Sequence, residues 1–248
     1  MAGRSNVFHG EGNAIRVAVT TAGCVIYWET GGVRVPIEYS NHEVQSRWGR
    51  PARYSLAKRA GGNEQLAILL PGQGYTLDAP LLHYAELAAL EAGCDVLGVE
   101  YGFQSNRSSI VSGDFPAIVD EVAGALERLA PPDQYKRCVF IGKSMGTAIL
   151  CEVSERLVLP VKNHIFLTPL RATISFIRQA ENAIVIVGDR DPLFGAADVE
   201  QISGFSNVKL EVVAGGDHSL EIEGDITASL DILHRVTHLC KTFCDSLL

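Results

Sequence analysis

The stretch CVFIGKSMGTAIL, residues 138–150, changes character at its centre. An apolar run at 138–141 is followed by Gly142-Lys143-Ser144-Met145-Gly146 and then by residues that favour a helix. A continuous apolar run is typical of a strand that is buried on both faces of a parallel sheet. The stretch therefore predicts a strand, a tight turn that contains Ser144, and a helix over 145–157.

The same alternation continues along the chain from residue 66. The apolar runs lie at 66–70, 94–99, 138–141, 164–167, 183–187 and 208–213, and the predicted helices lie at 79–92, 114–130, 145–157, 194–202 and 226–247. Strands that alternate with helices indicate a mostly parallel sheet with helices on both faces. Ligands bind such sheets at the carboxyl ends of the strands, so the residues after each run are the candidates for a site.

The N-terminal part has a different pattern. Residues 1–13 are small and polar and predict a flexible tail. Residues 14–40 alternate β-branched or aromatic residues with polar ones around glycine-containing turns, which indicates antiparallel strands. Residues 40–63 are polar, with scattered Gly and Pro, and predict a connecting segment. We therefore expect one α/β domain over 14–248 that begins with antiparallel strands.

Composition and charge argue against several classes of protein. The chain has 248 residues, 47% of them hydrophobic, and a net charge of −8, as expected of a globular protein that does not bind nucleic acid. The basic residues at 47–59 are interpreted as a solvated loop. No apolar run approaches the roughly 18 residues of a membrane span, and the N-terminus lacks the apolar core of a signal peptide. We expect a cytoplasmic protein without a membrane partner; its oligomeric state is left open.

The cysteines and histidines do not form a metal-binding pattern. The six cysteines are scattered, and no CxxC spacing occurs. Cys240 and Cys244, like His234 and His238, are four residues apart on a predicted helix and could share a metal ion. Neither pair has a third ligand or an HExxH motif beside it. We therefore predict no metal site and no cofactor.

Ser144 is the candidate nucleophile. A nucleophile on a strand-to-helix turn has its hydroxyl pushed out of the sheet, and the glycines at 142 and 146 relieve the crowding there. The GxSxG motif alone would arise by chance with an expectation of roughly 0.15 in this composition, so its strand-helix context carries the argument. A serine hydroxyl also needs a histidine to take its proton and a carboxylate to orient that histidine.

Two later strand ends supply both partners. The run at 183–187 is followed by GDRDPLF, which contains Asp189 and Asp191, and the run at 208–213 is followed by AGGDHSL, which contains His218. Two glycines before His218 allow this loop to turn toward the sheet. The chain order of serine, acid and histidine is the one associated with α/β-hydrolases.

With these pieces in place, the chain resembles the α/β-hydrolase superfamily, and within it the small serine hydrolases without a cap domain that are described as dienelactone hydrolase-like. The matching motifs are LLPGQG, GKSMG, GDRDP and GGDHSL, which span residues 66–220. In the family the acid commonly lies three residues after a strand-ending glycine, which favours Asp191 over Asp189. True dienelactone hydrolases use a cysteine nucleophile, so the serine argues against dienelactone itself as the substrate.

The resemblance also implies an oxyanion hole made of two backbone N–H groups. One donor is expected to be Met145, at the start of the helix after the nucleophile. The other is expected in PGQGY and should be Gln73, with Gly74 as the alternative. Many family members have His-Gly where this chain has Pro71-Gly72, which affects the shape of the loop.

The residues expected around the nucleophile suggest an open site. Segment 168–182 is too short to form a lid domain. The candidate substrate-binding residues are Tyr75, Tyr101, Lys143 and Phe194, with packing of the aromatic rings and a surface position of the lysine as the alternative interpretation.

The sequence thus predicts a serine hydrolase that cleaves a small-molecule ester or thioester. Ser144 would attack the carbonyl, His218 would act as base and then acid, and Asp191 would orient His218. The same triad would serve a peptidase, an acyltransferase or a C–C hydrolase, because the fold does not determine the reaction. A non-catalytic binding protein on this scaffold is a further alternative, which an incomplete triad would have favoured.

Overall fold

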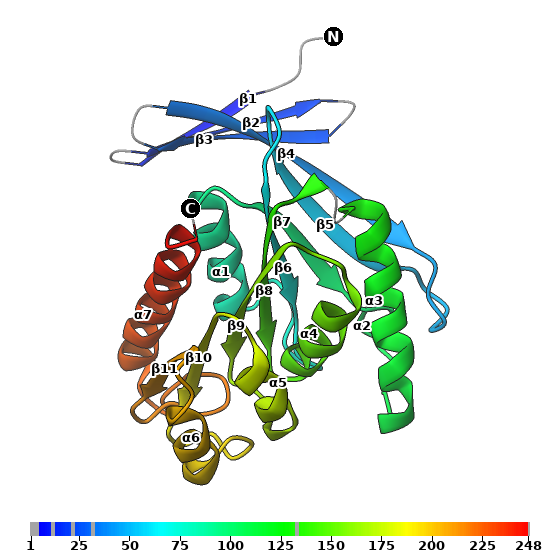
Figure 1. Ribbon diagram of the computed structural model, residues 1–248. Coiled ribbons are helices and arrows are strands. Elements are labelled where there is room, and N and C mark those ends of the chain that lie inside the picture. Colours follow the sequence, from blue (N-terminus) through cyan, green and yellow to red (C-terminus); the bar gives the residue numbers. More distant parts are fainter. Residues whose placement is uncertain (1–4, 11–12, 21–22, 31–32, 132–133, 248) are drawn as a thin grey trace.

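A mixed β-sheet forms the centre of the molecule (Figure 1). The computed structural model describes residues 5–10, 13–20, 23–30, 33–131 and 134–247, with side chains from residue 36 onward. Within this part of the chain the sheet has 11 strands, in the order β1-β2-β3-β4-β5-β7-β6-β8-β9-β10-β11. The strands are β1 (Ser5–Gly10), β2 (Asn13–Thr20), β3 (Gly23–Thr30), β4 (Val33–Val44), β5 (Ala52–Arg59), β6 (Gln65–Leu70), β7 (Asp95–Glu100), β8 (Arg137–Lys143), β9 (Val161–Leu167), β10 (Ala183–Gly188) and β11 (Val208–Val213).

Strands β6 to β11 are parallel, and β1 to β5 are antiparallel, with β5 joining β7. Every residue of β6 and of β10 is buried. Neighbouring residues of β6 face opposite sides, since Ile68 packs into one hydrophobic cluster and Leu69 into the other. A strand covered on both faces needs this continuous apolar sequence. The predicted parallel sheet with preceding antiparallel strands is confirmed.

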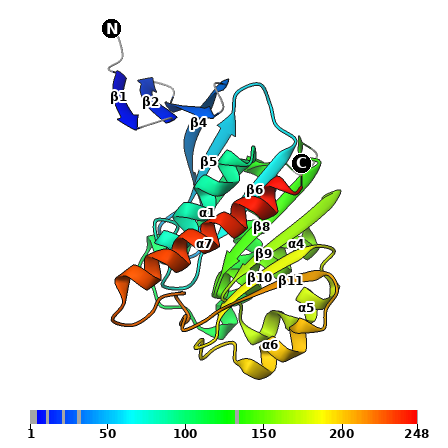
Figure 2. The ribbon, with the colours of Figure 1, turned by 90° about the vertical axis from the view of Figure 1, so that its left-hand side faces the viewer.

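Helices cover both faces of the sheet over its parallel strands. On one face α1 and α7 lie side by side (Figures 1 and 2), and on the other lie α3, α4, α5 and α6. The helical elements are α1 (Pro80–Glu91), α2 (Gly102–Ser105), η1 (Ser112–Asp114), α3 (Phe115–Leu129), α4 (Met145–Arg156), η3 (Arg171–Thr173), α5 (Ile174–Gln179), α6 (Ala196–Ser203) and α7 (Ile226–Asp245). The five long predicted helices are confirmed, whereas the short helices α2 and α5 were not predicted.

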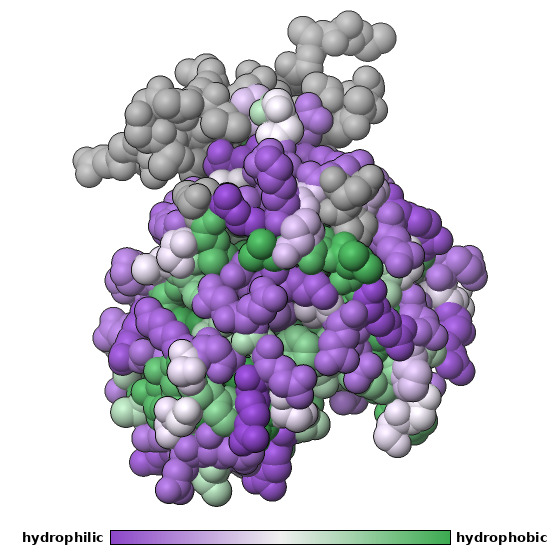
Figure 3. Space-filling model, viewed as in Figure 1, coloured by the Kyte–Doolittle hydropathy of each residue, from purple (hydrophilic) through white to green (hydrophobic). Residues whose placement is uncertain are grey.

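Each face of the sheet has its own hydrophobic core. Ile118 of α3, Ile149 of α4 and Ile177 of α5 belong to one cluster, and Leu82 of α1 and Val236 of α7 belong to the other. Outside these cores, the face shown in Figure 3 is largely hydrophilic, with hydrophobic residues in small separate patches. None of the helices in the described ranges combines the length and the apolarity needed to cross a bilayer.

Two N-terminal segments differ from their predicted structure. The predicted connecting segment, 40–63, contains the end of β4 and all of β5. In β5 the buried Tyr54 and Leu56 alternate with more exposed polar residues, which is the period of a strand that is partly solvated. The predicted tail, 1–13, lies partly outside the described residues, but its segment Ser5–Gly10 is β1, which pairs with β2.

The chain between β9 and β10 carries no cap domain. Only the short elements η3 and α5 lie between these strands. The carboxyl ends of β8, β10 and β11 are therefore left uncovered by any inserted domain, as predicted.

Candidate active site

Ser144 occupies a tight turn between β8, which ends at Lys143, and α4, which begins at Met145. Its backbone has φ 55° and ψ −120°, a conformation that residues with a side chain adopt at an energetic cost. Hydrogen bonds to both of its backbone groups hold it there. The Ser144 N–H donates to the Leu167 carbonyl at 3.1 Å. The Ser144 carbonyl accepts from Thr147 Oγ1 at 2.6 Å.

The glycines on either side of Ser144 permit close approach of backbones. A Cβ on Gly146 would lie 2.0 Å from the Leu70 carbonyl oxygen of β6, far inside contact distance. A Cβ on Gly142 would lie 2.8 Å from the carbonyl oxygen of Gly146. Only glycine avoids both clashes. Gly146 therefore lets the first turn of α4 lie against the end of β6, and Gly142 lets it lie against the end of β8.

The side chains of Ser144, His218 and Asp191 form a hydrogen-bonded series. His218 Nε2 lies 2.8 Å from Ser144 Oγ, and His218 Nδ1 lies 2.8 Å from Asp191 Oδ2. A carboxylate only accepts, so we assign the imidazole proton to Nδ1, which leaves Nε2 free to accept from the serine. Asp191 is 3% exposed, and its other oxygen accepts from the Leu193 N–H at 2.8 Å. The fold thus brings together three residues from the ends of β8, β10 and β11.

The neighbouring carboxylates have other partners. Asp189 Oδ1 accepts from the Gly215 N–H at 2.7 Å, and Asp217 Oδ1 accepts from the Ser219 N–H at 2.7 Å. Both contacts hold the backbone of the loop that carries His218. Of Asp189, Asp191 and Asp217, Asp191 is the one that contacts the imidazole.

The predicted oxyanion donors, Met145 and Gln73, lie together. Both line a cavity of about 200 Å³, whereas the alternative donor, Gly74, is not among its lining residues. Met145 is the first residue of α4, so its N–H has no acceptor within the helix and lies at the positive end of the helix dipole.

The loop that carries Gln73 is held by two side chains from the segment that follows β7. The Tyr101 hydroxyl donates to the Pro71 carbonyl at 3.1 Å, and Gln104 Nε2 donates to the Gly72 carbonyl at 2.9 Å. In a trans peptide the carbonyl and the following N–H point in opposite directions. By holding the Gly72 carbonyl, Gln104 therefore also fixes the direction of the Gln73 N–H.

The rest of this cavity consists of residues that the sequence analysis did not select. They lie between α2 and the first turn of α3: Ile110, Val111, Ser112 and Phe115. Val111 is 70% exposed. The available signal was the apolar pair at 110–111 within an otherwise polar loop.

The predicted substrate-binding residues do not line this cavity. Tyr101, Phe194 and Lys143 are at most 2% exposed, and Tyr101 stacks on Phe103 with ring centroids 5.4 Å apart. Tyr75 is half-buried, and its hydroxyl accepts from the Leu81 N–H at 2.9 Å. The aromatic residues therefore pack, as the alternative interpretation held. Lys143 is not on the surface, because its side chain lies beneath the loops of the site and contacts Tyr75 and His218.

The described thiols are not arranged for catalysis. Cys94, Cys138, Cys151, Cys240 and Cys244 are free and buried. Burial raises the pKa of the Cys138 and Cys240 thiols to about 12, which keeps both as weakly nucleophilic thiols. Among the side chains that the structure describes, no group of three His, Cys, Asp or Glu residues is placed to hold a metal ion.

The central sheet and the turn at Ser144 define an α/β-hydrolase. Residues 63–245 match the family model described as an alpha/beta hydrolase domain, and the chain belongs to that family. No curated protein matches the chain.

Several solved structures share the fold. An alpha-beta serine hydrolase homologue from Coxiella burnetii is 16% identical with a TM-score of 0.62, over 82% of this chain and 96% of that one. Mouse alpha/beta hydrolase domain-containing protein 10 is 11% identical with a TM-score of 0.64, over 84% of this chain and 100% of that one. A serine hydrolase without a lid from Xanthomonas campestris is 14% identical with a TM-score of 0.60, over 83% and 95%. At these identities the likeness concerns the fold alone.

Proposed function

We propose that this α/β-hydrolase cleaves an ester or thioester of a small molecule through an acyl-enzyme on Ser144. The observation that carries the proposal is the series of two 2.8 Å contacts that joins Ser144 Oγ, His218 and Asp191. A serine hydroxyl becomes an effective nucleophile when an oriented imidazole accepts its proton. No metal ion or organic cofactor is required for this chemistry.

The reaction would proceed in two halves. Ser144 Oγ attacks the substrate carbonyl while His218 Nε2 takes its proton, and Asp191 stabilises the imidazolium that forms. The N–H groups of Met145 and Gln73 would bind the negative oxygen of the tetrahedral intermediate. His218 then protonates the leaving alcohol or thiol. In the second half a water molecule, activated by His218, releases the acid from Ser144.

The cavity beside the oxyanion donors supports a short acyl group. Its volume is about 200 Å³, and Ile110, Val111, Phe115 and Met145 give it an apolar lining. Burial of an acyl chain against this lining contributes about 0.8 kcal/mol for each methylene group, until the cavity is filled. A small-molecule substrate with a short acyl chain therefore fits the site better than a long-chain lipid.

A fluorophosphonate probe tests the nucleophile. The wild type should be labelled, and Ser144→Ala should not be labelled. Ser203→Ala is the matched control, because Ser203 is exposed at the end of α6 and should leave labelling unchanged. Equal labelling of Ser144→Ala would refute the assignment.

A panel of p-nitrophenyl esters, thioesters and peptides tests the substrate class. We expect kcat/KM to rise from acetyl to butanoyl esters and to fall for long chains. Ile110→Trp fills part of the cavity and should reduce kcat/KM for butanoyl more than for acetyl esters. Preference for a dodecanoyl ester, or cleavage of peptides alone, would contradict this substrate class.

A further inference from the structure

Lys143 is a buried cation next to the nucleophile, and the reaction described above does not use it. It is 2% exposed, although lysine is rarely found fully inside a protein. Its Nζ donates to the His218 carbonyl at 2.9 Å and lies 4.8 Å from the centre of the Tyr75 ring. An aromatic face and a carbonyl oxygen are both favourable partners for an ammonium group.

These contacts join three separate segments of the site. Lys143 is the last residue of β8, Tyr75 lies in the loop after β6, and His218 lies in the loop after β11. The Tyr75 hydroxyl is itself anchored by the Leu81 N–H at the start of α1. Lys143 therefore connects the loop that carries the imidazole to the strand that carries the nucleophile.

The loop around His218 bends sharply and is held at several points. Gly215 has φ 74° and Leu220 has φ 59°, so the chain turns sharply on both sides of the histidine. Asp189 holds the loop at Gly215, and Asp217 holds it at Ser219. The bond from Lys143 falls between these two points, on the carbonyl of the histidine residue itself.

We propose that Lys143 is a positioning residue, whose ammonium group holds the His218 backbone so that the imidazole stays between Ser144 and Asp191. This inference rests on the proposed function, because it concerns the same site. It replaces the prediction of Lys143 as a substrate-binding residue, since the Nζ is buried against His218 and Tyr75. Displacement of an imidazole by about 1 Å can reduce a rate by about a hundredfold.

Lys143→Met tests the proposal, because methionine has a similar length and no donor. We expect kcat for a neutral acetate ester to fall by about tenfold to a hundredfold, the effect of losing one charge-assisted hydrogen bond, with KM nearly unchanged. Lys162→Met is the matched control. Lys162 Nζ also donates to a backbone carbonyl, that of Ser154, in the last turn of α4, at the opposite end of this helix from Ser144. This control should keep its kcat.

The imidazole itself gives a second readout that does not depend on turnover. The proton between His218 Nδ1 and Asp191 should give a downfield NMR resonance in the wild type and in Lys162→Met, and it should be lost or broadened in Lys143→Met. If Lys143→Met does not fold, Lys143→Gln keeps a shorter donor and should show a weaker form of both effects.

Three results would overturn the proposal. The first is an unchanged kcat and an unchanged resonance in folded Lys143→Met. The second is a rise in KM for a hemisuccinate ester alone, which would make Lys143 a substrate-binding group. The third is an equal loss in Lys162→Met. If the wild type does not react with fluorophosphonate but the resonance depends on Lys143, the proposed function fails and the positioning role stands.

Discussion

Asp189 and Asp191 are separated by a single residue, yet their carboxylates have different partners. Asp191 contacts the His218 imidazole at 2.8 Å, whereas Asp189 accepts from the backbone N–H of Gly215 at 2.7 Å. One carboxylate therefore orients the side chain of the histidine loop, and the other holds the backbone of that loop. Substitution of each residue in turn therefore compares these two roles within one turn of the chain.

Asp191→Asn should reduce kcat by about 10⁴-fold, the loss seen when the triad carboxylate of a serine protease becomes an amide. The amide can donate to Nδ1 and so favour the wrong tautomer. Asp189→Asn should change kcat by less than about threefold, because an amide oxygen still accepts from Gly215. Ester hydrolysis by the two variants measures the difference. A greater loss in Asp189→Asn would exchange the two roles.

Gln104→Glu should reduce kcat by about tenfold, with little change in KM. The carboxylate can still accept from the Tyr101 N–H, as the amide oxygen of Gln104 does at 3.2 Å, but it cannot donate to the Gly72 carbonyl. The Gln73 N–H then loses its fixed direction, which costs less than the roughly hundredfold or greater loss of a whole oxyanion donor. Gln201→Glu, on the exposed face of α6, is the control. No change in Gln104→Glu would argue against Gln73 as a donor.

Gly146→Ala should destabilise the protein by about 3 kcal/mol or more, since its Cβ would lie 2.0 Å from the Leu70 carbonyl oxygen. Gly124→Ala makes the same change within α3, where a Cβ would meet nothing within 4 Å. It should increase stability by about 0.5–1 kcal/mol, because alanine is the better helix former. Urea denaturation of both variants measures the two effects. A stable Gly146→Ala would mean that α4 can move away from β6.

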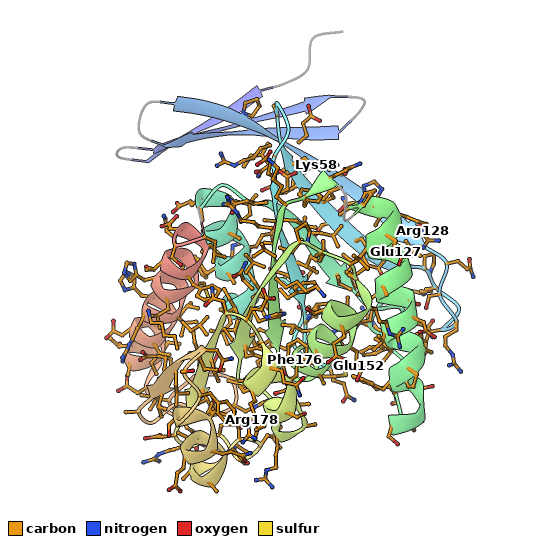
Figure 4. All side chains as sticks on the ribbon, viewed as in Figure 1. Lys58, Glu127, Arg128, Glu152, Phe176 and Arg178 are labelled. Atoms are coloured by element: carbon orange, nitrogen blue, oxygen red, sulfur yellow. The ribbon has the colours of Figure 1, made fainter. Side chains whose placement is uncertain are left out.

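His164 should make the protein less stable in acid. Its ring is 3% exposed and lies between the rings of Phe140 and Phe176, the latter on α5 (Figure 4), with Nε2 2.9 Å from Ser154 Oγ. Burial lowers the pKa of His164 from 6.5 to about 4. Between these values the unfolded chain binds a proton that the folded chain does not, so the free energy of unfolding decreases as the pH falls.

The loss between pH 6.5 and pH 4 should reach about 3 kcal/mol in the wild type relative to His164→Gln. Urea denaturation of both proteins at a series of pH values measures this difference. Glutamine can still bond to Ser154 and does not titrate. Parallel curves for the two proteins would show that His164 does not titrate in this range.

The parallel half of the fold could be predicted because burial on both faces leaves a clear pattern. Ile68 and Phe140 lie in unbroken apolar runs, and few other structures require such runs. Strand β5 was missed because one of its faces is polar, so that Arg53 and Ser55 interrupt the apolar residues. Because the predicted strands are parallel, their carboxyl ends were expected to meet at one edge of the sheet.

The residues that surround Ser144, Asp191 and His218 were harder to predict than these three residues themselves. Position after a strand placed Ser144 near His218, but it did not determine whether a neighbouring side chain faces the core or the solvent. Tyr101 and Phe194 follow strands and are buried. The cavity is lined instead by Val111 and its neighbours, which belong to a loop without periodicity.

Alkylation of the buried thiols would measure how often parts of the folded protein open. Cys138 lies on the strand that leads to Ser144, Cys151 on α4 behind it, and Cys240 on α7 across the sheet. Alkylating reagents should leave these three thiols unmodified in the folded hydrolase, and each of them should react only when its own element separates from the sheet. Mass spectrometry after timed alkylation would then compare how often the surroundings of Ser144 open with how often the opposite face of the sheet opens. The measurement uses the native protein and needs no engineered label.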